Sequence, residues 1–353
     1  MHVVIIGLVR RDQETPVKRL FSFDDINGDP VESRHAALTA YLFSAETVQN
    51  RHLVVVRSTT SLMNMPLARV GSKPVDGGHY IIDGNERNQL VEQHPDLKPF
   101  IRPFVGGHEL INGGDRWIFC LQNAAPEQMR HWPEVRRKIE QVRHYRESEG
   151  GALARSLAET PCEFHVTVFP KVPFLAIPEV SSERRDYVPI GWLNPPTIPS
   201  NQIIVVENAT IEMFGILASR MHMAWLRHIG GRLESRYRYS TGIVYNTFPW
   251  PDANKAQSEK VQKLAQAVLD ARSKFPNATF ADLYDADIMK PELRHAHHAL
   301  DAAVDRLYRA AEFPSDRDRV EHLFGLYERL VAPLMATPRS HRRRAKTRST
   351  PPA

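Results

Sequence analysis

The sequence lacks long apolar runs and has little cysteine. Only two of its 353 residues are cysteines, Cys120 and Cys162, and neither stands at metal-ligand spacing. A chain with only two thiols is typical of a protein in a reducing compartment and not of one stabilised by disulfides. No apolar stretch approaches the roughly 20 residues that a membrane helix needs, and Met1–Gly7 is too short and lacks the cationic start of a signal peptide. We therefore expect a cytoplasmic protein with no membrane partner.

Acidic residues are missing from the C-terminal tail. Residues 336–353 hold six basic side chains and no acidic one, so the tail alone exceeds the net charge of +5 and leaves the rest of the chain near −1. A basic, proline-flanked end of this kind is typical of a disordered segment, and the sequence pI of about 9.2 therefore says little about the fold. Local charge is more informative, because five arginines and one glutamate lie between Arg220 and Arg238.

Catalytic motifs are also missing. The only Asn-Pro-Pro, at residues 194–196, is followed by Thr197 and not by the aromatic residue that stacks a flipped base. Three glycine pairs lack the strand–turn–helix context of a nucleotide loop and are typical of hairpin turns: Gly77-Gly78, Gly106-Gly107 and Gly113-Gly114. The sequence therefore predicts no catalytic residue and no cofactor-binding residue.

A histidine cluster near the C-terminus suggests a metal site but does not complete one. His295, His297 and His298 have no cysteine or carboxylate at the spacing that a tetrahedral set needs. We interpret them as a solvated helix face and predict no metal site.

The segment Arg232–Tyr239 carries the clearest functional pattern. In an extended segment, side chains alternate between two faces. One face would then hold Arg232, Glu234, Arg236 and Arg238, and the other Leu233, Ser235, Tyr237 and Tyr239. Arginine can donate two hydrogen bonds to guanine, and glutamate can accept one from cytosine. The alternative is a salt-bridged surface strand with an apolar back.

This segment and several other blocks resemble the C-terminal half of MmeI-like DNA methyltransferases. That family comprises restriction-modification enzymes with nuclease, adenine methyltransferase and target-recognition parts on one chain. The resemblance runs from His2 to about Arg309. Its blocks are residues 18–21, 25–28, 71–74, 76–78, 101–104, 109–113, 116–117, 181–185, 189–191, 214–215, 221–225 and 245–251.

The resemblance implies roles for single residues. Glu234 and Arg236 would read one base pair together and Arg238 a neighbouring one, with Arg232 in the same row. A second group is expected to hold phosphates because of its local composition. It comprises the donor-rich turn with Ser182, Arg184 and Arg185, and Lys73 between Gly71 and Gly77. Such contacts would give affinity, register and a steep salt dependence. For this group an exposed loop remains the alternative. Met221–Trp225 is expected to pack in a core, with His222 close to DNA, and Arg102 to be structural.

Periodicity predicts the elements. Strands are expected at 2–9 and 18–23, paired as a hairpin, and at 101–104, 116–121, 166–169, 174–177 and 203–206. Helices are expected at 37–47, 84–94, 126–158, 213–229, 256–275, 292–311 and 319–334. The glycine-rich stretches 71–78 and 106–114 are expected to be a loop and a turn.

These elements predict an α+β fold: a mixed, β-rich target recognition domain followed by a small all-helical C-terminal domain. We expect residues 1–24 to be end strands of a missing methyltransferase catalytic domain. Residues 25–250 would be the recognition domain, 251–335 the helical domain and 336–353 a disordered basic tail.

Two classes of function stay open. The chain would recognise double-stranded DNA as part of a truncated or split adenine-specific methyltransferase. S-adenosylmethionine would then bind to the missing catalytic domain or partner chain, and the chain alone would have no activity. Alternatively, it is a stand-alone DNA-binding or protein-interaction remnant. A self-sufficient enzyme with an unrecognised site is a weaker third reading.

Overall fold

Two buried strands lie at the centre of the protein. The computed structural model describes residues 6–23, 28–45, 48, 50 and 52–336. Strands β7 (Phe174–Pro178) and β11 (Ile203–Glu207) pair antiparallel, and β3 (Ala68–Val70) and β9 (Gly191–Leu193) complete the order β3-β11-β7-β9. Both central strands are continuous apolar runs because both faces of this sheet are covered.

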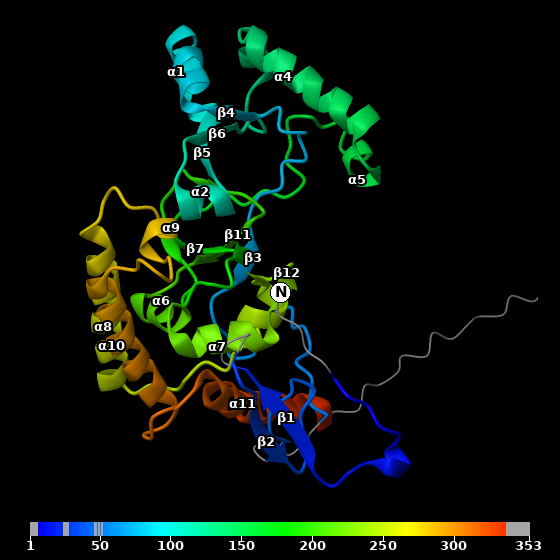
Figure 1. Cartoon of the computed structure of the whole chain (residues 1–353). Helices are drawn as coiled ribbons and strands as arrows, with labels where there is room; N and C mark the ends of the chain where they lie inside the picture. Colours follow the sequence, from blue (N-terminus) through cyan, green and yellow to red (C-terminus); the bar gives the residue numbers. More distant parts are fainter. Residues whose placement is uncertain (1–5, 24–27, 46–47, 49, 51, 337–353) are drawn as a thin grey trace, which may run out of the picture.

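A second sheet with a hydrophobic core of its own lies at the top of the molecule in Figure 1. Its order is β10-β5-β6-β4, from β4 (Ile81–Asp83), β5 (Ile101–Val105), β6 (Arg116–Phe119) and β10 (Ile198–Pro199). Its helices are α1 (Gly84–Gln93), α2 (Gly107–Asn112), α3 (Pro126–Arg130), α4 (Pro133–His144) and α5 (Ala152–Arg155). A 3-10 helix, Pro95–Phe100, leads into β5, and a π-helix, Tyr145–Glu149, follows α4.

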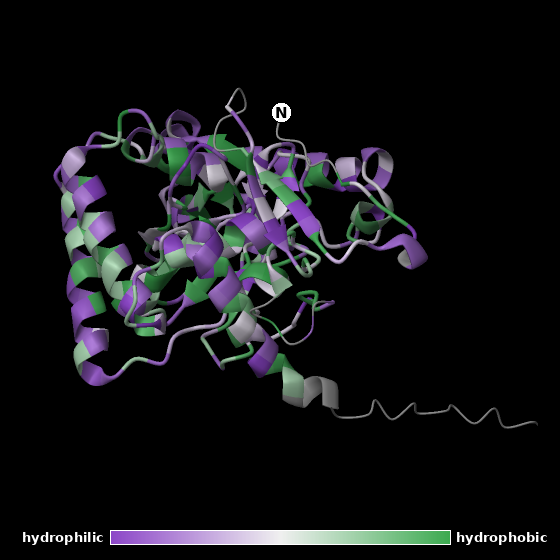
Figure 2. Cartoon of the chain, turned by 60° about the horizontal axis from the view of Figure 1, so that its bottom comes forward, coloured by the Kyte–Doolittle hydropathy of each residue, from purple (hydrophilic) through white to green (hydrophobic). Residues whose placement is uncertain are grey.

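The remaining helices all lie in the C-terminal part of the chain. They are α6 (Ile211–Leu217), α7 (Arg220–Ile229), α8 (Lys255–Ser273), α9 (Phe280–Leu283), α10 (Pro291–Tyr308) and α11 (Asp316–Ala336). Helices α8 and α10 lie side by side (Figure 1), and hydrophilic and hydrophobic residues alternate along the long helices (Figure 2). Their apolar faces share one core with α6, α7 and the sheet. A Cβ on Gly215 of α6 would meet the Ala265 side chain at 2.8 Å, so glycine permits this close helix contact.

Two small sheets complete the fold. Strands β12 (Gly231–Leu233), β13 (Arg236–Arg238) and β8 (Val180–Ser181) form one, in the order β12-β13-β8. Strands β1 (Lys18–Ser22) and β2 (Val31–His35) form the other, after a short 3-10 helix at Arg11–Gln13. A π-helix, Thr241–Tyr245, follows β13.

The α+β class predicted from the sequence is confirmed, and most expected elements exist near their expected positions. The helix expected at 213–229 is, however, two helices. Ser219 separates α6 from α7, because its hydroxyl accepts from the backbone amide of His222 and so caps α7. The apolar pattern runs unbroken across this cap and therefore concealed it.

In the N-terminal part the strand expected at 18–23 is present as β1, but two other expectations were wrong. Residues 1–5 of the expected strand 2–9 lie outside the described residues, and Ile6, Leu8 and Val9 are exposed and outside any strand. Strand β1 pairs with β2 and not with this segment. The described part of the expected helix 37–47 is a turn closed by the bridge between Leu38 and Ser44. The Thr39 hydroxyl there accepts backbone amide hydrogen bonds that a helix would use otherwise.

Two further segments differ from expectation. Only Val166 of the expected strand 166–169 makes a ladder contact, an isolated bridge to Lys73. The stretch 106–114 contains helix α2, whose first turn is closed by the Glu109 carboxylate accepting from the Gly106 amide at 2.7 Å.

Candidate nucleic-acid interface

The arginine-rich segment forms a tight hairpin. Strands β12 and β13 pair with Leu233 opposite Arg236, so Glu234 and Ser235 are the two turn residues. Glu234 has φ of +59°, a left-handed conformation that is uncommon for a residue with a side chain. The single extended strand expected here was therefore wrong, and the glutamate lies at the hairpin tip.

The turn also changes which side chains share a face. Residues paired across antiparallel strands project to the same side. Arg232 is opposite Tyr237, and Leu233 is opposite Arg236. Arg232 consequently lies on the tyrosine face, not beside Arg236 and Arg238 as the alternation predicted. Its guanidinium stacks on the Tyr237 ring at 4.1 Å, and burial lowers its pKa.

The other two arginines are exposed and paired with carboxylates. Arg236 donates to Glu234 at 2.9 Å, and the two side chains are 45% and 77% exposed. Arg238 donates from Nε to Glu179 at 3.0 Å and is 56% exposed. Exposed ion pairs of this kind contribute only about 0–1 kcal/mol, so a DNA base or phosphate can replace the protein partner at low cost.

Glu179 was not singled out from the sequence. It lies 59 positions before Arg238 (238 minus 179), between β7 and β8. Its backbone carbonyl also accepts from the Tyr239 amide at 2.7 Å. The position of Glu179 directly after the buried run 174–178 was the feature of the sequence that could have drawn attention to it. Only the pairing of β8 with β13, however, brings this carboxylate to the hairpin.

The hairpin is anchored from its back. Tyr237 and Tyr239 are 8% and 2% exposed, as expected for the apolar face. Tyr239 Oη lies 2.8 Å from Nε2 of His222 on α7. Burial lowers the pKa of His222 to about 3, so its ring is neutral near neutral pH. His222 is fully buried and its ring is part of the core, as expected for Met221–Trp225, while its closeness to DNA stays a prediction.

The donor-rich loop after β8 lies beside this hairpin, since Ser181 pairs with Tyr237. Ser182 and Arg184 are accessible, and Arg184 donates to Asp287 at 2.5 Å in a pair that is about two-thirds exposed. Arg185 is half-buried, and burial lowers its pKa. Lys73 is exposed but belongs to another region, where its backbone pairs with Val166.

Comparisons with known proteins identify the family. Residues 49–252 match the model of the MmeI target recognition domain, and residues 253–335 match that of the MmeI C-terminal domain. The chain belongs to the MmeI family. The resemblance inferred from the sequence blocks is thereby confirmed.

Two relatives of this MmeI-family chain show its extent. DNA methyltransferase A of Bacillus subtilis (strain 168) is 35% identical over 329 residues, which are 93% of the chain and 36% of that protein. The type IIL restriction-modification enzyme MmeI, solved in complex with DNA, is also 35% identical, with a TM-score of 0.83. That match covers 91% of the chain and 42% of the MmeI chain. The chain thus spans about two fifths of the length of these relatives.

The glycine and proline motifs of this MmeI-family chain do not fit an S-adenosylmethionine site. Gly106-Gly107 does join a strand to a helix, contrary to expectation, but α2 has only six residues and the Glu109 carboxylate closes its start. The Gly106 amide is therefore already taken by the protein itself and is not free for a ligand. Asn194–Pro196 is an exposed turn. We therefore derive no reaction step from these residues.

The histidine cluster is only partly a solvated face. His295 and His298 are exposed, as expected, but the third histidine is not. His297 is fully buried, lies 2.9 Å from the Tyr284 hydroxyl and stacks on Tyr187. Within the described ranges, no three His, Cys, Asp or Glu side chains are arranged to hold a metal ion. None of the helices described combines the length and apolar character that crossing a bilayer requires.

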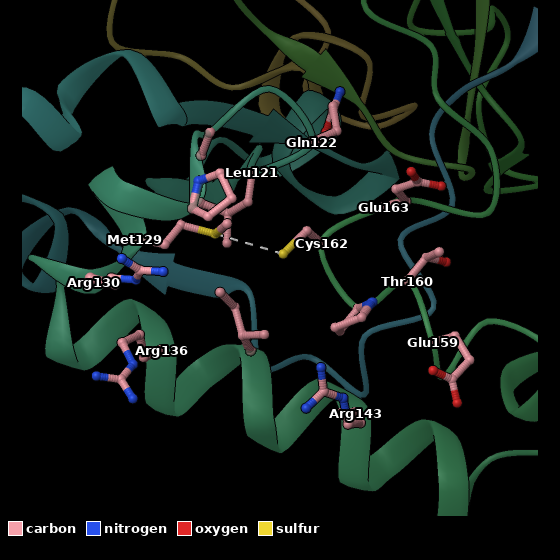
Figure 3. A pocket seen from close by; sticks show the side chains of 14 residues that line it. Leu121, Gln122, Met129, Arg130, Arg136, Arg143, Glu159, Thr160, Cys162 and Glu163 are labelled. Atoms are coloured by element: carbon pink, nitrogen blue, oxygen red, sulfur yellow. Dashed lines mark hydrogen bonds between the residues drawn. The ribbon is translucent and has the colours of Figure 1, made fainter.

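A cleft of about 400 Å³ lies elsewhere, between α4 and the loop 159–163 (Figure 3). Its floor includes the sulfur atoms of Met129 and Cys162, 3.9 Å apart, and Arg130, Arg136 and Arg143 line it. It contains none of the residues expected to contact DNA, so the hairpin surface remains the candidate interface.

Proposed function

We propose that this chain reads the base sequence of double-stranded DNA through the recognition hairpin, residues 231–239. Glu234 and Arg236 would address one base pair and Arg238 a neighbouring one, while Arg232 braces the hairpin against Tyr237. The observation that carries this proposal is an exposed set of charged side chains on a hairpin with a buried tyrosine back. Each bidentate base contact contributes about 1–3 kcal/mol of discrimination.

The phosphate contacts would come from the loop beside the hairpin, Ser182, Arg184 and Arg185, and from Lys73. Because Arg184 is engaged only in an exposed pair with Asp287, phosphate can compete for it. Such contacts fix register without reading sequence, and they make binding fall with salt.

We further propose that methyl transfer to adenine, with S-adenosylmethionine, belongs to a catalytic methyltransferase domain or chain that works with this one. The support is the N-terminal hairpin, where Phe21 and Phe23 are exposed and where β1 and β2 pair with no other strand of the described residues. A two-stranded hairpin gains little stability alone. Its exposed face is suited to packing against that catalytic part.

The DNA-reading proposal is tested by selecting duplexes from a randomised pool with the purified chain and with Arg236→Ala. We expect the wild type to enrich a defined sequence and the variant to lose preference at one base pair, by about tenfold or more. Arg137→Ala, in an exposed pair on α4, is the matched control and should keep the preference. An unchanged preference in Arg236→Ala would refute the assignment.

The catalytic proposal is tested separately. Transfer of labelled methyl groups to the selected duplex should require a methyltransferase chain supplied in addition to this one. Transfer by the purified chain alone would refute it. Sequence-specific binding that no such chain converts into methylation would favour the stand-alone DNA-binding alternative.

A further inference from the structure

A carboxylate on the C-terminal helix gathers arginines from the helix that precedes the hairpin. Asp316 begins α11, and its Oδ1 accepts from Arg220 Nε at 2.7 Å while its Oδ2 accepts from Arg227 Nη1 at 2.5 Å. Arg319 donates to the same Oδ1 at 3.3 Å. The Asp316 side chain is only 17% exposed. One largely buried carboxylate therefore compensates cations on both α7 and α11.

The surroundings hold this carboxylate in its ionised form. Burial alone would raise the pKa of Asp316, but the hydrogen bond from Arg220 and the charges of Arg220, Arg227 and Arg319 together lower it. Arg319 in turn makes two hydrogen bonds to Asp305 on α10, at 3.0 and 2.6 Å. Charge-assisted bonds with this two-point geometry fix position as well as contribute energy.

The start of α7 is held by a second carboxylate of α10. Asp301 accepts from the Arg220 backbone amide at 2.7 Å and from the Tyr187 hydroxyl at 2.6 Å. An acidic group at a helix N-terminus is favourable because it faces the positive end of the helix dipole. Helix α7 is thus tied to the C-terminal helices at its first residue by Asp301 and at both ends by Asp316.

Helix α7 leads directly into the hairpin. It ends at Ile229, and β12 begins at Gly231. A Cβ on the intervening Gly230 would meet the Leu226 carbonyl oxygen at 2.5 Å, so the chain turns tightly there. The carbonyl of Arg227 accepts from Arg232 Nη2 at 3.0 Å, and Arg232 stacks on Tyr237. The orientation of the hairpin therefore depends on where the end of α7 is held.

We propose that Asp316 is a positioning residue for DNA readout: by holding Arg227 and Arg220 it sets the orientation of the hairpin that carries Arg236 and Arg238. The proposal rests on the DNA-reading function proposed above. With Asp316 in place, Arg220 and Arg227 are neutralised. Without it, Arg220 becomes available to phosphates of any sequence, and Arg227 keeps only weaker contacts, with the Asp186 carboxylate at 3.8 Å and the Arg185 carbonyl at 3.4 Å. The hairpin then loses the tie between the end of α7 and α11.

The test compares the full chain with Asp316→Asn, which keeps the side-chain shape, and Asp316→Ala. Asp318→Asn, in the same turn of α11, is the matched control. The first measurement is amide hydrogen exchange, which needs no DNA. We expect exchange across residues 231–239 to rise by about tenfold or more in both Asp316 variants, with little change in β5 and β6.

The second measurement is affinity for the selected duplex and for a scrambled duplex. We expect the ratio of the two affinities to fall by about tenfold or more in the Asp316 variants, mainly through loss of specific binding, and to stay unchanged in Asp318→Asn.

Three results would overturn the proposal. The first is unchanged exchange in the hairpin, and the second is a uniform rise throughout the protein, which would mean general destabilisation. The third is an equal gain of both affinities, which would mean that Asp316 merely repels DNA. If the wild type binds all duplexes equally, the DNA-reading function fails, whereas the exchange measurement still decides whether Asp316 holds the hairpin.

Discussion

The buried hydroxyl of Tyr239 offers a direct test of how the hairpin is anchored. Tyr239 Oη is the partner of His222 Nε2 at 2.8 Å, and the other ring nitrogen of His222 is buried with no hydrogen-bond partner. Tyr239→Phe keeps the ring and removes only the hydroxyl. It leaves a buried imidazole with no partner at either nitrogen.

The expected cost follows from that geometry. A buried polar group left without its partner costs about 1–3 kcal/mol. The packing change is small because phenylalanine fills the same ring volume. We expect the free energy of unfolding to fall by about 2 kcal/mol. His222→Leu should cost a similar amount for the opposite reason, since it leaves the tyrosine hydroxyl buried and unpaired.

The double variant separates this account from a general packing defect. Removing both polar groups leaves nothing unsatisfied, so its cost should be less than the sum of the single costs by about 1 kcal/mol or more. Urea unfolding measures all three, and the midpoint should move without a change of slope. Strictly additive costs, or a Tyr239→Phe variant as stable as the wild type, would refute the reasoning.

The same variant links the anchor to recognition. Tyr245→Phe is the matched control, because it removes a hydroxyl that donates to the Pro66 carbonyl at 2.8 Å, outside the hairpin. Both variants should lose stability. Only Tyr239→Phe should also weaken base preference in the randomised selection. If Tyr239→Phe and Tyr245→Phe weakened base preference equally, the loss of preference would result from lower stability alone.

Three further predictions follow from buried or strained groups. Arg146→Met should lower the free energy of unfolding, measured in urea, by about 3 kcal/mol or more. The reason is that the buried Arg146 guanidinium donates to five backbone carbonyls at 2.8–3.0 Å, and all five would lose this donor. A smaller loss would mean that water replaces the guanidinium. The His222 pKa is about 3 in the fold and 6.5 otherwise, so its stability contribution is complete above pH 6.5 and declines as the pH falls toward 3. The decline should be about 2 kcal/mol by pH 5, and His222→Leu should lack this part of the pH dependence in urea midpoints measured at both pH values. Glu234→Gly should raise hairpin stability by up to about 1 kcal/mol, because glycine adopts the positive φ freely. The same variant should lose preference at the base pair read by Glu234. Hydrogen exchange measures the stability of the hairpin and duplex selection measures the preference, and a destabilised hairpin would contradict the stability prediction.

Much of the fold could be predicted from periodicity because the responsible interactions are local. The 84–94 and 256–275 helices carry their own caps, Asp83 and Asn254, and the strands around 174–177 and 203–206 are apolar runs of strand length. Resemblance of ordered blocks gave the family. Prediction failed where the local sequence pattern did not reflect the structure. The Ser219 cap lies within an unbroken apolar run. Residues 37–45 are held by distant packing, since the Tyr41 and Phe43 rings contact Phe324.

By itself, the sequence determined that a charged, tyrosine-backed segment would lie at the surface of an α+β recognition domain. Only the tertiary structure decided which of its residues act together. A two-residue turn at Glu234 moves Arg232 to the tyrosine face. Strand pairing brings Glu179 to Arg238, and α11 brings Asp316 to Arg227 from 89 positions away. Such partners are fixed by strand register and helix packing, which depend on the whole core and leave no mark in the spacing of the residues along the chain.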